Sequence, residues 1–104
     1  MNTNQKSEIE NFVLSKAKDR KLAVLISGSG SNLQAILDAS ASGELRAQVV
    51  AVVSNKADAF GLERARRANV PAIVKLKAQA QDRRAYDAEL ADLVLLYQPD
   101  WIVL

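Results

Sequence analysis

The sequence predicts an α/β fold built on a parallel sheet, and three observations support this prediction. Apolar runs alternate with amphipathic stretches along residues 21–104, which is the pattern of strand–helix–strand units. The run Val49–Val53 is continuously apolar, as in a parallel strand that is covered on both faces. A glycine turn separates the first apolar run from its helix. Right-handed crossovers then favour a Rossmann-like three-layer sandwich with strand order 3-2-1-4.

The first strand and helix are predicted within residues 22–41. Leu22–Ile26 is an apolar run that indicates a buried strand. Residues 32–41 follow the glycine turn with apolar side chains at helical spacing. The apolar face of this helix consists of Leu33, Ile36 and Leu37. Gly43 ends the helix, because glycine readily adopts the left-handed backbone that follows a helix terminus.

The remaining elements alternate in the same way. Val49–Val53 is the second strand, residues 61–69 form a helix, and Ala72–Leu76 is the third strand after Pro71. The longest helix covers Arg83–Tyr97, and its apolar stripe consists of Tyr86, Leu90, Leu93, Val94 and Tyr97. Residues 101–104 begin a fourth strand. This strand would leave an exposed apolar edge, so we expect the front part of a longer domain whose C-terminal part is missing.

We expect two segments along the chain. Residues 1–20 form an N-terminal extension in which Ser7 and Glu10 have the spacing of a capping box, which predicts a short amphipathic helix. This helix either docks on the domain or binds a partner. Residues 21–104 form the N-terminal, phosphate-binding half of a domain, and the whole chain is long enough for only one small core.

Composition excludes several classes of protein. The 104 residues include no cysteine and no histidine, which excludes disulfides and thiolate metal sites, and we expect no bound metal. The formal net charge of +2 gives no strong field toward nucleic acid. No apolar stretch approaches the ~20 residues of a membrane span, and the N-terminus lacks a signal-peptide apolar segment. These features favour a cytoplasmic protein with neither a nucleic-acid nor a membrane partner.

The turn after the first strand is the strongest candidate site. The first N–H groups of a helix have no partners within it, and the helix dipole adds partial positive charge, so a phosphate fits there. We expect the N–H groups of Gly30, Ser31 and Asn32 to point at phosphate oxygens, with the side chains of the latter two as further donors. Gly28 and Ser29 support the turn, since glycine lets the backbone bend tightly. The alternative is a turn without a ligand, capped by Ser31.

Three absences narrow the choice of phosphate ligand. A dinucleotide-binding fingerprint needs a third glycine where this chain has Leu33. The acid expected after the second strand for a ribose hydroxyl is replaced by Ser54-Asn55-Lys56. No Gly-Lys-Ser/Thr follows the glycines, which excludes a P-loop. The remaining candidate is a small phosphate monoester.

Four segments carry a resemblance to a known family. They are residues 25–36, 53–65, 83–87 and 99–104. In this order they resemble the opening of the phosphoribosylglycinamide formyltransferases, the folate-dependent enzymes of purine biosynthesis. The resemblance runs from Lys21 to the last residue and covers about the first half of the family's domain.

The resemblance implies an activity and site residues. The family transfers a formyl group from 10-formyltetrahydrofolate to the amine of glycinamide ribonucleotide. By this resemblance Gly30, Ser31 and Asn32 hold the 5′-phosphate of that substrate. Arg83 contacts the folate, with Arg84 as the second choice and a solvated first-turn position as the alternative for Arg83. The family's catalytic Asn, His and Asp lie beyond the fourth strand, so no catalytic residue is expected here and the chain alone is expected to be inactive.

Two other functions stay open at this point. One is a non-catalytic phosphoribosyl- or nucleotide-binding module that pairs with another chain or self-associates through the unfinished sheet edge. The other is a nucleic-acid-binding fragment, which only the basic isoelectric point suggests.

Overall fold

Four strands form one parallel sheet in the order β3-β2-β1-β4, and three helices connect them. The computed structural model describes residues 19–104, so the helix predicted in the N-terminal extension lies outside the described residues. The elements are β1 (Arg20–Ile26), α2 (Ser31–Ser42), β2 (Ala47–Ser54), α3 (Phe60–Arg67), β3 (Ala72–Val74), α4 (Arg83–Leu95) and β4 (Trp101–Val103). The predicted fold class and strand order are confirmed.

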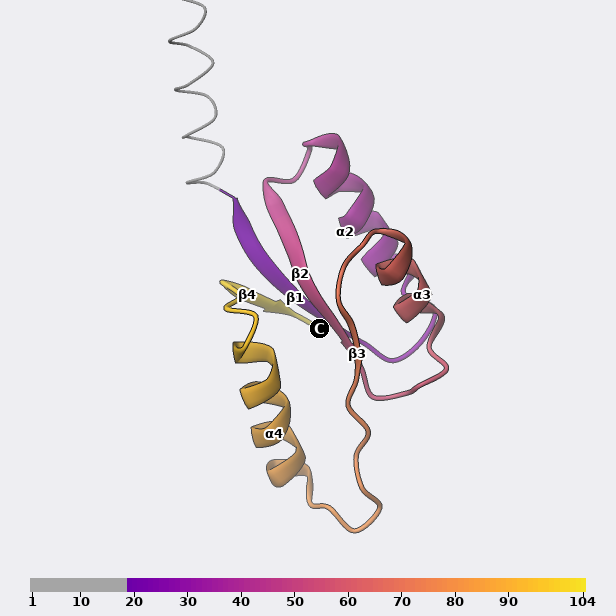
Figure 1. Cartoon of the computed structure of the whole chain (residues 1–104), viewed down its shortest axis with the longest axis vertical. Coiled ribbons are helices and arrows are strands. Elements are labelled where there is room, and N and C mark those ends of the chain that lie inside the picture. The colour runs from indigo at the N-terminus through magenta and orange to yellow at the C-terminus, as the bar shows by residue number, and fades with distance from the viewer. Residues whose placement is uncertain (1–18) are drawn as a thin grey trace, which may run out of the picture.

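The helices cover both faces of the sheet (Figure 1). Helices α2 and α3 lie on one face, and α4 lies on the other. Strand β1 bonds to β2 on one side and to β4 on its other side, so the winding of the chain reverses between β1 and β4. In open α/β sheets this reversal leaves a crevice beyond the carboxyl ends of the strands, where ligands bind.

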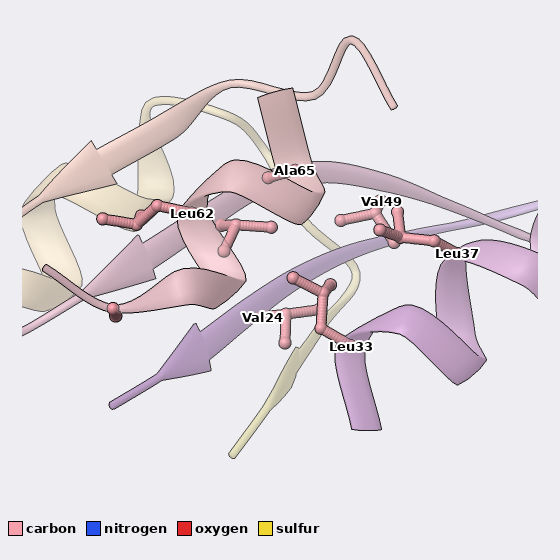
Figure 2. Packing of buried hydrophobic residues seen from close by; sticks show 8 residues of the cluster. Val24, Leu33, Leu37, Val49, Leu62 and Ala65 are labelled. Atoms are coloured by element: carbon pink, nitrogen blue, oxygen red, sulfur yellow. The ribbon is translucent and has the colours of Figure 1, made fainter. Parts of the chain in front are cut away.

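The larger core lies between the sheet and helices α2 and α3 (Figure 2). Val24 of β1 faces Leu33 of α2, and Val49 of β2 faces Leu37. Leu62 of α3 is fully buried in the same cluster. Burying each leucine side chain contributes roughly 2 kcal/mol. This packing holds the start of α2 against β1, immediately after the candidate turn.

A bulge in β2 keeps this core continuous. The register between β1 and β2 shifts after Leu22 and leaves Val50 as an extra residue. Side chains of a regular strand alternate between faces, and a bulge displaces that alternation by one residue. Val49 and Val52 therefore both belong to the core under α2 and α3.

The smaller core lies under α4. Tyr86 and Val94 are buried, and Leu90 and Leu93 are half-buried, so most of the predicted apolar stripe faces the sheet. The Tyr86 hydroxyl donates to the carbonyl of Lys75 at 2.7 Å. This bond fixes the loop after β3 against the first turn of α4.

Four elements end earlier than the sequence predicts. Helix α3 ends at Arg67 instead of residue 69, and β4 ends at Val103 instead of residue 104. Helix α4 ends at Leu95 instead of Tyr97, and Gln98 has a left-handed backbone (φ 51°), as the following proline disfavours the helical region for it. Strand β3 ends at Val74 because its partner β2 ends at Ser54, which is paired with Val74. The Lys75 N–H still donates to the Ser54 carbonyl at 2.8 Å, and after Lys75 this segment pairs with no strand within residues 19–104.

Strand β4 forms an edge of the sheet. It pairs with β1, and no strand within residues 19–104 pairs with its other side. Large apolar side chains are exposed around this edge, and we call them the β4 patch: Leu95, Leu96, Trp101, Ile102 and Leu104.

Candidate functional site

Residues 27–30 join β1 to α2 at the carboxyl edge of the sheet. Gly30 is the N-cap of α2 and has a left-handed backbone (φ 75°, ψ 29°), which glycine adopts without strain. No side chain caps α2, and its first turn contains no acidic residue. Within residues 19–104 no acceptor receives the N–H groups of Ser31, Asn32 or Leu33. The turn therefore presents unpaired donors together with the positive end of the helix dipole.

These donors face a pocket of about 200 Å³. Its polar side is lined by Gly28, Gly30, Ser31 and Asn32. Val103 also lines it, from β4, the strand that pairs with β1. The pocket therefore lies where the winding of the chain reverses. The side chains of Ser31 and Asn32 are exposed. The structure thus brings the predicted phosphate-binding residues together in one crevice.

A close contact between two glycines shapes this turn. A β-carbon built on Gly30 would lie 2.6 Å from the Cα of Gly61, which is in the first turn of α3. One built on Gly61 would clash with Cδ1 of Ile26. The Gly61 N–H donates to the Gly28 carbonyl at 3.2 Å. Neither contacting glycine can be replaced without moving its neighbours.

Arg64 of α3 holds the same turn through its guanidinium group. Its Nε donates to the Ser29 carbonyl at 2.8 Å, and its Nη1 donates to Oε1 of Gln34 at 3.2 Å. The Phe60 ring lies 5.0 Å from the guanidinium carbon, within the range of a cation–π contact. Helix α3 therefore supports both the turn and the first part of α2.

Two details of the predicted turn need correction. The N-cap of α2 is Gly30 and no side chain caps the helix, so the expected capping by Ser31 is wrong. Glycine is required sterically at Gly30 but not at Gly28, because a β-carbon there would meet nothing within 4 Å. Gly28 contributes its carbonyl, which accepts the bond from α3.

A second pocket of about 240 Å³ opens on the α4 side of the sheet. Arg83 and Lys77 supply basic groups to its lining, and Tyr86 and Leu90 supply apolar surface. The two pockets share Leu25, Ile26, Ser27 and Leu104, so they adjoin at the carboxyl end of β1. Arg83, the predicted folate residue, therefore lines a pocket next to the turn of residues 27–30.

Arg83 and Arg84 occupy different positions in the first turn of α4. The side chain of Arg83 is 79% exposed and forms an ion pair with Asp87 at 3.2 Å. Arg84 is not among the residues that line the second pocket. Its backbone N–H donates to the capping carboxylate of Asp82 at 2.6 Å. The geometry favours Arg83 over Arg84 as the ligand-facing arginine.

Comparison with known proteins establishes the family. Residues 20–104 match the formyl transferase family. The chain belongs to this family. Within it, the phosphoribosylglycinamide formyltransferase of Escherichia coli is 51% identical over 83 residues, which cover 80% of this chain and 39% of that protein.

Other relatives agree with this assignment. The phosphoribosylglycinamide formyltransferase of Schizosaccharomyces pombe is 46% identical over 91 residues, covering 79% of this chain and 44% of that protein. The crystal structure of glycinamide ribonucleotide transformylase 1 from Symbiobacterium toebii superposes with a TM-score of 0.77 at 48% identity, covering 80% of this chain and 39% of that one. This formyl transferase chain thus spans about two fifths of the length of the relatives it matches.

Gly61 and Arg64 contact the candidate turn of this formyl transferase chain, and neither was predicted from the sequence. Glycine within the predicted helix 61–69 was the available signal, because a helical glycine costs stability and often marks a close backbone approach. Nothing in the sequence distinguishes Arg64 from the other basic residues of the same helix.

The segment after β2 forms a turn closed by a serine. Ser54 is fully buried, and its hydroxyl donates to the Lys56 carbonyl at 2.9 Å while accepting the Lys56 N–H at 3.0 Å. Asn55 lines the second pocket. A short hydroxyl side chain therefore stands where a dinucleotide-binding sheet would present an acid.

Two absences concern only residues 19–104. No three His, Cys, Asp or Glu side chains gather there in a way that could hold a metal ion. None of the described helices has the length and apolar character needed to cross a membrane.

Proposed function

We propose that this chain carries the substrate-phosphate part of a phosphoribosylglycinamide formyltransferase of purine biosynthesis. In this reaction the amine of glycinamide ribonucleotide attacks the formyl carbon of 10-formyltetrahydrofolate. A C–N bond forms to the amine, the bond from the formyl carbon to N10 breaks, and one amine proton moves to the tetrahydrofolate product. Family membership and the 51% identity to the Escherichia coli enzyme support this assignment.

The observation that carries the proposal is the pocket at the start of α2. The N–H groups of Gly30, Ser31 and Asn32 would receive the 5′-phosphate, and the last two side chains would add neutral donors. The absence of an acidic residue from the first turn of α2 supports an anionic ligand, because a carboxylate there would compete with it.

The second pocket would hold the formyl donor. Leu25, Val53, Tyr86 and Leu90 form an apolar lining that suits a flat ring system, and Arg83 and Lys77 suit a carboxylate. Because the two pockets adjoin at the end of β1, the two ligands would approach each other there. Arg83 is the residue we assign to the folate.

The 104-residue chain is proposed to bind without catalysing. Formyl transfer needs a group that removes the amine proton and a group that stabilises the tetrahedral oxyanion. The chain contains no histidine, and we assign neither role to any residue of the described part. We propose a cytoplasmic protein whose ligands are small molecules, with no role for metal, nucleic acid or membrane.

The test is a titration with glycinamide ribonucleotide, followed by backbone amide shifts in the full chain. Shifts concentrated at residues 28–32 are expected. A folded sample with no response at these residues contradicts the assignment. Shifts spread over the basic face of α3 would instead indicate non-specific attraction of the anion.

A second candidate function is a phosphoribosyl-binding module that pairs with another chain or with itself. The β4 patch favours it, because Trp101 is 63% exposed and Leu104 is 94% exposed beside an unpaired strand edge. Light scattering over a concentration series tests self-association. A monomer at every concentration would argue against pairing of copies through this edge.

A further inference from the structure

We propose that Arg64 is a positioning residue that turns the backbone N–H groups of the phosphate turn toward the ligand. The inference rests on the proposed function, because it concerns the pocket assigned to the substrate phosphate. Arg64 is not among the residues that line this pocket. It acts from α3, through the Ser29 carbonyl of the turn.

Two consecutive carbonyl groups of the turn accept bonds from α3. The Gly28 carbonyl accepts the Gly61 N–H, and the Ser29 carbonyl accepts Nε of Arg64. The peptide bonds within residues 19–104 are all trans, so the N–H of each unit points away from its C=O. The N–H groups of Ser29 and Gly30 therefore point away from α3. The pocket is lined by residues of β1, the turn, α2 and β4 and by no residue of α3.

The charge of Arg64 strengthens these donors as well as orienting them. A hydrogen bond to a charged donor polarises the accepting carbonyl, and the effect passes along the peptide to its N–H. The peptide in question joins Ser29 to Gly30, so the Gly30 N–H becomes the better donor to an anion. Arg64 is thus coupled to the phosphate without touching it.

The planar guanidinium fixes the turn and α2 as one unit. Its second bond goes to Oε1 of Gln34, and the Gln34 amide donates to Oδ1 of Asp38 at 2.9 Å. Two donors of one rigid fork therefore hold residues on either side of the helix start. The Phe60 ring beside Arg64 restricts the orientation of that fork further.

The test compares Arg64→Met with the parent in the full 104-residue chain, using inorganic phosphate as the probe. Methionine keeps a long apolar side chain against Phe60 and removes both donors. We expect the phosphate Kd to rise about tenfold, the size of a lost charge-assisted hydrogen bond. We also expect the Gly30 amide resonance to shift in the absence of phosphate, because the peptide that joins Ser29 to Gly30 loses its hydrogen bond from Arg64.

Arg67→Met is the matched control. Arg67 lies on the same helix, 5.5 Å from the same Phe60 ring, and pairs with Glu63 at 3.5 Å. Its removal changes the net charge equally, and it forms no hydrogen bond to the turn. We expect little change in Kd for this variant. Equal weakening in both variants would mean a net-charge effect and overturn the inference, as would an unchanged Kd and Gly30 resonance in Arg64→Met.

Arg64→Lys keeps the inference testable if Arg64→Met does not fold. Lysine retains the charge but lacks the planar fork, so we expect native thermal stability with only part of the phosphate affinity. Full affinity in Arg64→Lys would overturn the geometric role. If the parent itself gives no phosphate-induced shifts, the proposed function fails, and the Gly30 resonance of the ligand-free variants still decides whether Arg64 orients the turn.

Discussion

Gly30 and Gly61 lie in direct backbone contact, and this contact sets the distance between the turn of residues 27–30 and α3. A β-carbon on Gly30 would lie 2.6 Å from the Cα of Gly61, and one on Gly61 would lie 3.1 Å from the Cα of Gly30. The atom that obstructs a β-carbon on Gly30 is a backbone atom, which cannot rotate away, whereas the nearest atom to a β-carbon on Gly61 is the flexible Cδ1 of Ile26. Relief would require the turn and the helix to separate, and the pocket would change with them.

The first prediction concerns these glycines. We expect Gly30→Ala to lower the free energy of unfolding by about 3 kcal/mol, because it combines a positive φ with a backbone clash. We expect Gly61→Ala to cost less, about 2 kcal/mol, since alanine recovers some helix propensity and Ile26 can adjust. Urea denaturation measures both values.

Gly28→Ala is the matched control for the glycine prediction. Its β-carbon would meet nothing within 4 Å, so we expect a change within about 0.5 kcal/mol. A cost at Gly28 as large as that at Gly30 would show that the turn has another conformation in solution.

The second prediction separates binding from stability at the start of α2. Ser31→Asp places a carboxylate in the pocket that lacks one. We expect phosphate affinity to fall at least about tenfold through like-charge repulsion. The same change should raise the free energy of unfolding by about 0.5 kcal/mol, because negative charge is favourable at a helix N-terminus. Amide shifts and urea denaturation measure the two effects.

Ala35→Asp is the control for this substitution. Ala35 is exposed on the same helix and does not line the pocket. It receives the same charge, so we expect at most a small loss of phosphate affinity. If both variants bind phosphate as the parent does, the start of α2 is not the anion site.

The third prediction concerns the core that holds α2 in place. Leu33 is 1% exposed and faces Val24. We expect Leu33→Ala to lower the free energy of unfolding by about 3 kcal/mol, through lost burial and the cavity left behind. Leu45→Ala removes the same atoms from a side chain that is 39% exposed, and we expect it to cost less than about 1 kcal/mol. Equal costs would mean that Leu33 is not packed as the structure shows.

Most of this fold could be predicted because the strands can be located from their own residues. The apolar runs and the glycine turn specify the strands, and the handedness of crossovers then leaves strand order 3-2-1-4. Element ends were less predictable. Strand β3 stops at Val74 because β2 supplies no further partner, which depends on a neighbouring strand and not on the local residues.

Only the part of the candidate site at the start of α2 could be predicted from the sequence. The donors of Gly30, Ser31 and Asn32 follow from the turn and the helix that comes after it. Their support by Gly61 and Arg64 depends on how α3 lies against the turn. Local spacing does not determine that placement, because β2 separates the turn from α3 along the chain and the two come into contact only in the folded structure.

The fourth prediction tests the second pocket through two neighbouring arginines. Arg83 lines that pocket, whereas Arg84 does not. We expect Arg83→Ala to weaken binding of tetrahydrofolate about tenfold, as a charge-assisted contact to a carboxylate is lost. Its exposed ion pair with Asp87 contributes only a few tenths of a kcal/mol, so stability should hardly change.

Arg84→Ala decides whether that loss comes from position or from charge. It removes one positive charge from the same helical turn, and its backbone N–H can still donate to Asp82. We therefore expect folate affinity within about twofold of the parent, since a screened surface charge acts weakly at a distance. Isothermal titration calorimetry on the two variants and the parent measures the difference. A larger loss in Arg84→Ala than in Arg83→Ala would reverse the assignment and place the folate carboxylate on the other side of α4.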